Sequence, residues 1–285
     1  MPYLLLTLTS TVLLLYTFTR PRIHTGLVAA AVSLGSSLAL SDLLVSVVWK
    51  LYIFHPGLLP GGRDLVLGAF LADFLFVPFL LASLAVLFPK HPVGVWFVAL
   101  VVVEGVEILF LRAGLLTYDG WRLWYSAALF GARFALELWW IAHFRQVGYT
   151  PWYRYLLITT SLTYIWWVVY VVTCSLLSLW AMRLHLLPDP TSDKVLGMFL
   201  LSGLPLYVVG LALIWLRRAG SLLHLGVTGA AWAGYLYVLE GLGIWVGRPG
   251  WSPLYQAALA MCVIWASGRL DAWWAGERPA AAKVR

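Results

Sequence analysis

The sequence predicts an all-α, polytopic membrane protein, and three observations support this fold class. Of the 285 residues, 62% are hydrophobic and 11% are charged, which is more apolar surface than a soluble core of this size can bury. The apolar runs are long enough to cross, as helices, a hydrocarbon layer about 30 Å thick. They also lack the alternating pattern of outer-membrane β-strands. Lipid is therefore the expected surrounding of most of the chain.

These runs predict about nine transmembrane helices. They cover residues 3–18, 26–48, 65–88, 93–111, 123–143, 155–180, 195–216, 226–246 and 252–268. The connections are short and contain Pro, Gly and charged residues, as in His55-Pro56-Gly57. Residues 3–18 can also be interpreted as a signal peptide. They have no basic segment before them and no small-residue cleavage site after them, so we expect them to remain as a helix.

The basic residues predict the orientation in the membrane. One set of helix ends carries eleven Lys and Arg residues, and the opposite set carries seven. The positive-inside tendency assigns the richer set to the cytoplasm. We therefore predict a location in the cytoplasmic membrane, with the N-terminus outside and the C-terminus inside. Contact with anionic lipid headgroups accounts for the net charge of +7, which then requires no nucleic acid.

An internal repeat is indicated by landmarks that recur in order. Residues 64–71 (DLVLGAFL) recur as 193–200 (DKVLGMFL), and Gly120-Trp121 recurs as Gly250-Trp251. We predict two four-helix copies, preceded by an extra N-terminal helix and followed by a cytoplasmic tail; the four parts are residues 1–25, 26–150, 151–275 and 276–285. An even number of helices separates equivalent points, so the copies should be parallel. A ligand site is expected near the midplane, at the seam between the copies.

Ionisable side chains inside the predicted helices are the main candidates for function, because a charge at the bilayer centre costs on the order of 3 kcal/mol. The set has six acids and one base: Asp42, Asp73, Glu104, Glu107, Glu137, Glu240 and Arg133. Arg133 and Glu137 are four residues apart and can form a structural ion pair. Glu240 falls near the position of Glu107 in the second copy if a short gap is allowed. Alternatively, protonated acids hydrogen-bond neighbouring helices and only stabilise the fold.

Aromatic residues also occur deep in the predicted helices, where no interface holds them. Trp167, Tyr170 and Tyr237 are candidates for the wall of a substrate pocket, to which Glu104 and Asp42 also contribute. A ring beside a cation contributes about 0.5–2 kcal/mol. Contact with lipid is the alternative role. We expect no metal and no cofactor, because the sequence has neither a Cys/His cluster with zinc spacing nor a phosphate-loop or diphosphate–magnesium motif.

The passage from Asp42 to Phe88 resembles the three-helix lycopene cyclase domain of bacterial and archaeal carotenoid cyclases. In that family an aromatic-rich helix end and a Pro/Gly loop precede a helix with Pro, a hydrophobic residue, Glu-Glu and then aromatic-Leu-Phe. Here Trp49, Tyr52 and the loop at His55 lead to Leu71-Ala72-Asp73-Phe74-Leu75-Phe76, in which Asp73 stands for the acidic pair. In the second copy the Pro remains, at Pro205, and both acids are absent.

The stretch from Glu107 to Tyr125 also resembles uncharacterised Trp-rich membrane proteins of spore-forming bacteria. The cyclase resemblance implies an enzyme that protonates a polyene or epoxide and guides the carbocation within an aromatic pocket. We therefore predict a cyclase that acts on a lipophilic isoprenoid, with Asp73, Glu107 and Glu240 as acids or cation-stabilising groups.

Two other functions remain open at this stage. The first is a transporter or binding protein with acids at the seam, whose helices break at Pro78 and at Gly203-Leu204-Pro205. The second is a membrane protein with only a structural role. The sequence does not determine the oligomeric state.

Overall fold

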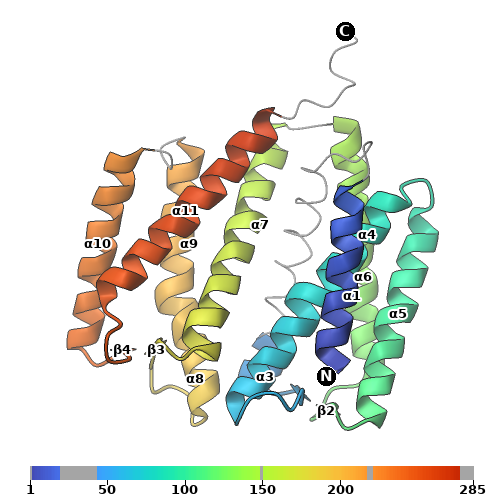
Figure 1. Ribbon diagram of the computed structural model, residues 1–285, viewed down its shortest axis with the longest axis horizontal. Coiled ribbons are helices and arrows are strands. Elements are labelled where there is room, and N and C mark those ends of the chain that lie inside the picture. The colour runs from blue at the N-terminus through green and yellow to red at the C-terminus, as the bar shows by residue number, and fades with distance from the viewer. Residues whose placement is uncertain (1, 20–43, 148–149, 217–220, 277–285) are drawn as a thin grey trace. The chain divides into compact units, whose positions relative to one another are not determined.

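The computed structural model describes residues 2–19, 44–147, 150–216 and 221–276 (Figure 1). Five helices in these ranges are long and apolar enough to cross a membrane: Gly62–Leu87, Pro92–Arg112, Ile158–Leu176, Pro190–Trp215 and Leu222–Gly241. A shorter apolar helix covers Pro2–Phe18. The chain is thus a helical protein with several helices of bilayer length. Most of the predicted span 26–48, including Asp42, lies outside the described residues.

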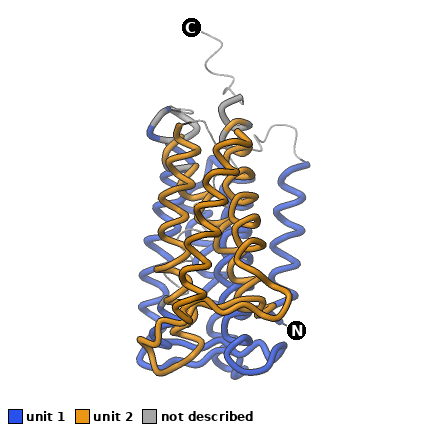
Figure 2. The backbone as a smooth tube through the Cα atoms, turned by 90° about the vertical axis from the view of Figure 1, so that its left-hand side faces the viewer, with its two compact units in different colours: residues 1–153, 277–285 blue, residues 154–276 orange. Residues whose placement is uncertain are grey.

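The chain divides into two compact units, which are described separately (Figure 2). The first unit comprises residues 1–153 and 277–285, and the second comprises residues 154–276. In the first unit the helices are α1 (Pro2–Phe18), η1 (Leu44–Val48), α3 (Gly62–Ala69), η2 (Phe70–Phe76), α4 (Val77–Leu87), α5 (Pro92–Arg112) and α6 (Leu123–Val147), where η denotes a π-helix. The strands are β1 (Tyr52–Phe54) and β2 (Leu116–Tyr118), which pair antiparallel.

Helix α1 packs against η2 and α4, and helix α5 packs against α6. The hydroxyl of Tyr3, at the start of α1, donates a hydrogen bond of 2.7 Å to the carbonyl oxygen of Leu115, beside β2. The N-terminus of α1 therefore lies at the same end of the first unit as the β1–β2 pair, as Figure 1 also shows.

From η3 (Val171–Leu176) onward, the second unit repeats the order of elements that the first unit has from η1 onward. Its helices are α7 (Pro151–Tyr170), η3 (Val171–Leu176), α8 (Pro190–Gly197), η4 (Met198–Gly203), α9 (Leu204–Trp215), α10 (Leu222–Gly241) and α11 (Pro253–Gly276). Strand β3 (Trp180–Met182) pairs antiparallel with β4 (Trp245–Gly247). Each unit therefore has a π-helical segment followed by a strand, a helix with a central π-segment, a further helix, a second strand and a last helix.

An aspartate near the start of α3 or α8 binds the loop that precedes it. The carboxylate of Asp64 accepts hydrogen bonds from the backbone N–H groups of residues 57–59, at 2.8–2.9 Å. The carboxylate of Asp193 accepts four such bonds from residues 184–187, at 2.8–3.2 Å. Because charge-assisted hydrogen bonds are among the stronger ones in proteins, these two aspartates hold the loops in shape.

A glycine one turn further along allows each of these helices to approach a strand closely. A Cβ atom at Gly68 would collide with the Cβ atom of Phe54 in β1. A Cβ atom at Gly197 would lie 2.8 Å from the carbonyl oxygen of Met182 in β3. The aspartate and glycine landmarks of the repeat thus have structural roles that are the same in both units.

The breaks expected at Pro78 and Pro205 are π-helical segments within continuous helices. Proline lacks an N–H group, and its ring clashes with the carbonyl of the residue four positions earlier. A wider π-turn before the proline relieves that clash. Side chains from other helices donate to carbonyls in these turns: Thr7 to Leu71 at 3.2 Å, and Tyr235 to Leu201 at 2.9 Å.

Candidate functional site

The described residues of the first unit enclose a cavity of about 300 Å³. This is the volume of about ten water molecules in the liquid, and it falls at the lower end of the range for small-molecule pockets. Residues from α1, β1, η2, α4, α5, β2 and α6 line it, and most of them are apolar. Seven of them are aromatic: Tyr3, Tyr52, Phe54, Phe76, Phe110, Trp121 and Phe130.

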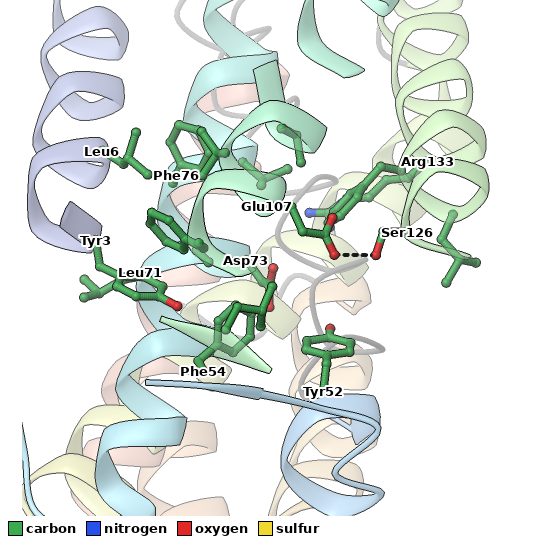
Figure 3. A pocket seen from close by; sticks show the side chains of 18 of the residues that line it. Tyr3, Leu6, Tyr52, Phe54, Leu71, Asp73, Phe76, Glu107, Ser126 and Arg133 are labelled. Carbon is green, nitrogen blue, oxygen red and sulfur yellow. Dashed lines mark hydrogen bonds between the residues drawn. The ribbon is translucent and has the colours of Figure 1, made fainter. Parts of the chain in front are cut away.

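Three ionisable side chains also line this cavity: Asp73 from η2, Glu107 from α5 and Arg133 from α6. Asp73 and Arg133 are 3% and 8% exposed, so neither is a surface group. Figure 3 shows Asp73 and Glu107 directed into the same space, with Arg133 reaching toward Glu107. Two acids and a base from three different helices therefore meet in a mostly apolar cavity.

Two hydroxyl groups donate hydrogen bonds to one oxygen of Glu107. The Oγ of Ser126 donates to Oε1 at 2.6 Å, and the hydroxyl of Tyr118 donates to the same oxygen. Nε1 of Trp121 in turn donates to Oγ of Ser126 at 2.8 Å. Burial and the hydrogen bond to Glu107 raise the pKa of Tyr118, so its hydroxyl remains a proton-bearing donor at neutral pH. This network fixes the orientation of the Glu107 carboxylate.

Local sequence explains how these side chains reach the cavity. Asp73 lies in the π-turn that precedes Pro78, and such turns change the direction of side chains relative to a regular helix. Helix α5 ends at Arg112, and Gly114 follows with a φ of 68°, a conformation that glycine adopts readily. This turn leads directly into β2, which returns Tyr118 to the neighbourhood of Glu107.

Glu240 does not belong to this cavity. It is exposed near the end of α10, in the second unit, and it is absent from the cavity wall. The expected equivalence with Glu107 is wrong, because Gly114 and Gly243 follow α5 and α10 with similar positive φ angles of 68° and 72°. These two glycines align the copies at an offset of 129 residues without a gap. At this offset the counterpart of Glu107 in the second unit is Leu236.

The three aromatic candidates all lie in the second unit. Trp167 and Tyr170 are 4% and 1% exposed, and they pack in the core of that unit. The ring of Trp167 stacks on Phe199 at 5.7 Å, and the ring of Tyr170 meets Trp180 edge-on at 4.8 Å. Tyr237 is 45% exposed. None of the three contributes to the first-unit cavity.

The cavity position also differs from the expectation of a seam between two copies. All the residues that line it belong to the first unit. The space lies where α1 and the β1–β2 pair close one unit. A ligand site at the seam between the copies stays a prediction. Glu104, although one turn from Glu107, does not line this cavity.

Comparison with known proteins finds no matching family model, curated protein or solved structure. The chemistry of the site therefore has to be inferred from the geometry described above.

Arg133 and Glu137 interact electrostatically, as their spacing indicates, but the described residues show no hydrogen bond between them. Arg133 lines the cavity, whereas Glu137 is fully buried. Neither carboxylate oxygen of Glu137 has a hydrogen-bond partner among the described residues. Arg133 is therefore close enough to act on the charge of Glu137 while it also lines the cavity.

Sequence reasoning did not include Tyr3, Tyr118 and Ser126 among the candidates. Tyr118 lies in a connection between predicted helices, and its role depends on the pairing of β2 with β1. Trp121, which the sequence indicated only as part of the repeat, lines the cavity and donates to Ser126. The recurring Gly120-Trp121 landmark pointed to this segment without indicating its contacts.

Proposed function

We propose that the first unit is the catalytic unit of an integral membrane enzyme that cyclises a lipophilic isoprenoid by protonation. The observation that supports this most is the joint placement of Asp73 and Glu107 in one aromatic, mostly apolar cavity. An acid in a desolvated site can protonate a weak base, and aromatic faces stabilise a cation that forms beside them. The resemblance to the lycopene cyclase domain is a second, weaker support for the same chemistry.

In the proposed reaction the carboxylic acid of Asp73 protonates a carbon–carbon double bond or an epoxide. The O–H bond of Asp73 breaks, and its proton forms a bond to carbon or to the epoxide oxygen, which leaves a carbocation. A second double bond attacks that cation and closes a ring. The Asp73 carboxylate then takes a proton from a neighbouring carbon, which regenerates the acid and makes product an isomer of substrate.

Glu107 has a different role in this proposal. Its Oε1 accepts hydrogen bonds from Ser126 and Tyr118, so the carboxylate is held in place rather than free to deliver a proton from that oxygen. We assign it to stabilising the carbocation electrostatically. Preorganised charge in a water-poor site is effective because it needs no reorganisation during the reaction.

We also propose that the chain arose by tandem duplication of a four-helix unit, with α1 added before it. The recurring order of helices and strands supports this, as do the Asp64/Asp193 and Gly68/Gly197 pairs. The proposed topology has about nine transmembrane helices. Its two copies are parallel, with the N-terminus outside and the C-terminus in the cytoplasm. Labelling of single cysteines introduced at Lys90, which the topology places in the cytoplasm, and at Arg248, which it places outside, would test the topology from each side of the membrane.

The proposed activity is tested with purified protein in detergent micelles, without added magnesium. Candidate substrates are squalene-like, carotenoid and epoxy-prenyl lipids, and products are separated by chromatography. Asp73→Asn should reduce product by at least a hundredfold, because an amide cannot donate a proton of comparable acidity. The matched control is Asp119→Asn, which changes an exposed acid of the same unit and should retain full product.

Cyclisation by Asp73→Asn at the rate of the unmodified protein would contradict the proposal, as would a requirement for magnesium. Monodisperse elution of each variant shows that a loss of product does not result from misfolding.

A proton-coupled transporter is the second candidate, and the position of Asp73 inside a π-turn favours it. Such turns often occur at functional sites and at bends. Here Asp73→Asn would mimic the protonated acid, so binding of the lipophilic compound would persist while proton movement disappears. A variant that binds but neither cyclises nor couples to protons would support the transporter and exclude the cyclase.

A further inference from the structure

The second unit has a cleft of about 420 Å³ along its β3–β4 pair, and three cationic side chains line it. Arg183 follows β3, Arg248 follows β4, and Lys194 lies in the first turns of α8. Backbone hydrogen bonds hold the two arginines at the ends of the ladder: Arg183 N–H donates to Ile244 at 2.8 Å, and Arg248 N–H donates to Leu179 at 2.7 Å. The backbones of the two arginines are therefore fixed by the pairing of β3 with β4.

The acidic residues near this cleft are occupied elsewhere. Asp193 accepts four backbone hydrogen bonds from the preceding loop, and Asp189 caps α8 by accepting from the backbone and side chain of Ser192. No ion pair joins Arg183, Lys194 or Arg248 to any of the described acids. The positive charge of the cleft is therefore not neutralised within the part of the unit that the structure describes.

The first unit lacks this charge at the corresponding positions. With the offsets of 128–129 residues set by the strands and glycines, Arg183 corresponds to His55, Lys194 to Leu65 and Arg248 to Asp119. The basic cleft is thus a property of the second unit and not a requirement of the shared fold. Three neighbouring cations repel one another, and the shared fold does not require them. The cleft that they line is therefore a candidate binding site.

We propose that this cleft binds a phosphate group. Two guanidinium groups and one ammonium group match the charge and the acceptor geometry of phosphate oxygens, and arginine can bind them in a bidentate manner. The hydroxyls of Ser178 and Thr191 line the same cleft and can donate further hydrogen bonds. Because the cleft lies at the end of membrane-length helices, the phosphate can come from an anionic phospholipid headgroup or from inorganic phosphate in solution.

Two arms of one experiment distinguish these sources. The full-length protein is placed in nanodiscs of phosphatidylcholine with increasing phosphatidylglycerol, and separately titrated with inorganic phosphate in detergent micelles at constant ionic strength. Retention of labelled lipid and thermal unfolding are the measurements. The unmodified protein should bind at least one of these phosphate sources in a saturable manner. Saturation only with phosphatidylglycerol identifies a headgroup site, and saturation with inorganic phosphate identifies a site for the free anion.

The double variant Lys194→Gln/Arg248→Gln should weaken the binding by at least tenfold, given roughly a fivefold loss for each cation removed near a membrane surface. The control variant Arg63→Gln/Arg122→Gln removes two cations from the first unit and should retain binding. No saturable binding in either arm, or equal loss in both double variants, would overturn the proposal. Chloride at the same ionic strength must not reproduce the effect. Cyclisation is measured on neither arm, so this result is independent of the proposed activity.

Discussion

The first and second units share their order of helices and strands, their loop-binding aspartates and the glycines at close helix–strand contacts. They differ in the polar residues inside. At the offsets set by the glycine landmarks, Asp73 corresponds to Ser202, Glu107 to Leu236 and Arg133 to Val263. Every charge that lines the first-unit cavity thus has a neutral counterpart in the second unit. The aspartates that bind the loops, in contrast, are present in both.

The two units also differ in how their interiors are filled. Tyr52 and Leu116 line the first-unit cavity, whereas their counterparts are Trp180 and Trp245, which are each 1% exposed. Helix α1 adds Tyr3 and Leu6 to the cavity wall, and the second unit has no counterpart of this helix among its described elements. The comparison separates residues that maintain the scaffold, which recur, from residues that make a site, which occur once.

The largest expected effect concerns the glycines that recur. Gly68→Ala and Gly197→Ala should each lower the free energy of unfolding by about 1–3 kcal/mol, because the added methyl group meets a strand. Gly105→Ala is the control, since nothing lies within 4 Å of its added Cβ. Thermal unfolding in detergent, followed by circular dichroism, measures all three. Unchanged stability of Gly68→Ala and Gly197→Ala would show that the close helix–strand approach is not a shared structural device.

An effect of similar size is expected for the recurring aspartates. Asp193→Ala should destabilise by about 1–3 kcal/mol, because four backbone N–H groups lose a charged acceptor. Asp64→Ala should cost less, because it accepts three such bonds and is less buried. The two unfolding curves are compared directly. A larger loss for Asp64→Ala would contradict the assignment of equivalent roles.

Leu116→Trp copies the residue that the second unit has at this position. The larger ring should occupy much of the 300 Å³ cavity, so stability should change by about 1 kcal/mol or less while product formation falls at least tenfold. The product assay and the unfolding curve are measured on one preparation. Full activity with a filled cavity would mean that the reaction takes place elsewhere.

The smallest effect is expected for Tyr118→Phe, which removes one hydroxyl donor to Glu107 and keeps the ring. Loss of one hydrogen bond typically costs about 0.5–1.5 kcal/mol. Product formation should therefore fall by less than in Asp73→Asn, about two- to tenfold. Tyr125→Phe, whose ring lies at 5.4 Å from Trp121 outside the network, is the matched control. An equal loss in both variants would indicate a general effect of removing a tyrosine hydroxyl.

The sequence by itself predicted a helical fold with several helices long and apolar enough to cross a membrane, because long apolar runs leave few alternatives to helices in lipid. It also identified Asp73 and Glu107, since an acid in an apolar run is conspicuous, and it revealed the recurring Asp and Gly landmarks. The helix positions follow from the same local pattern, which depends on neighbouring residues along the chain.

Only the tertiary structure decided which of the acids meet. Residues 52 and 118 are partners across β1 and β2, and this long-range pairing brings Tyr118 to Glu107. The exposure of Glu240 and the burial of Trp167 depend on how each helix is rotated against its neighbours. These helices are apolar on nearly all sides, so hydrophobic periodicity cannot indicate which face turns inward, and packing determines it instead.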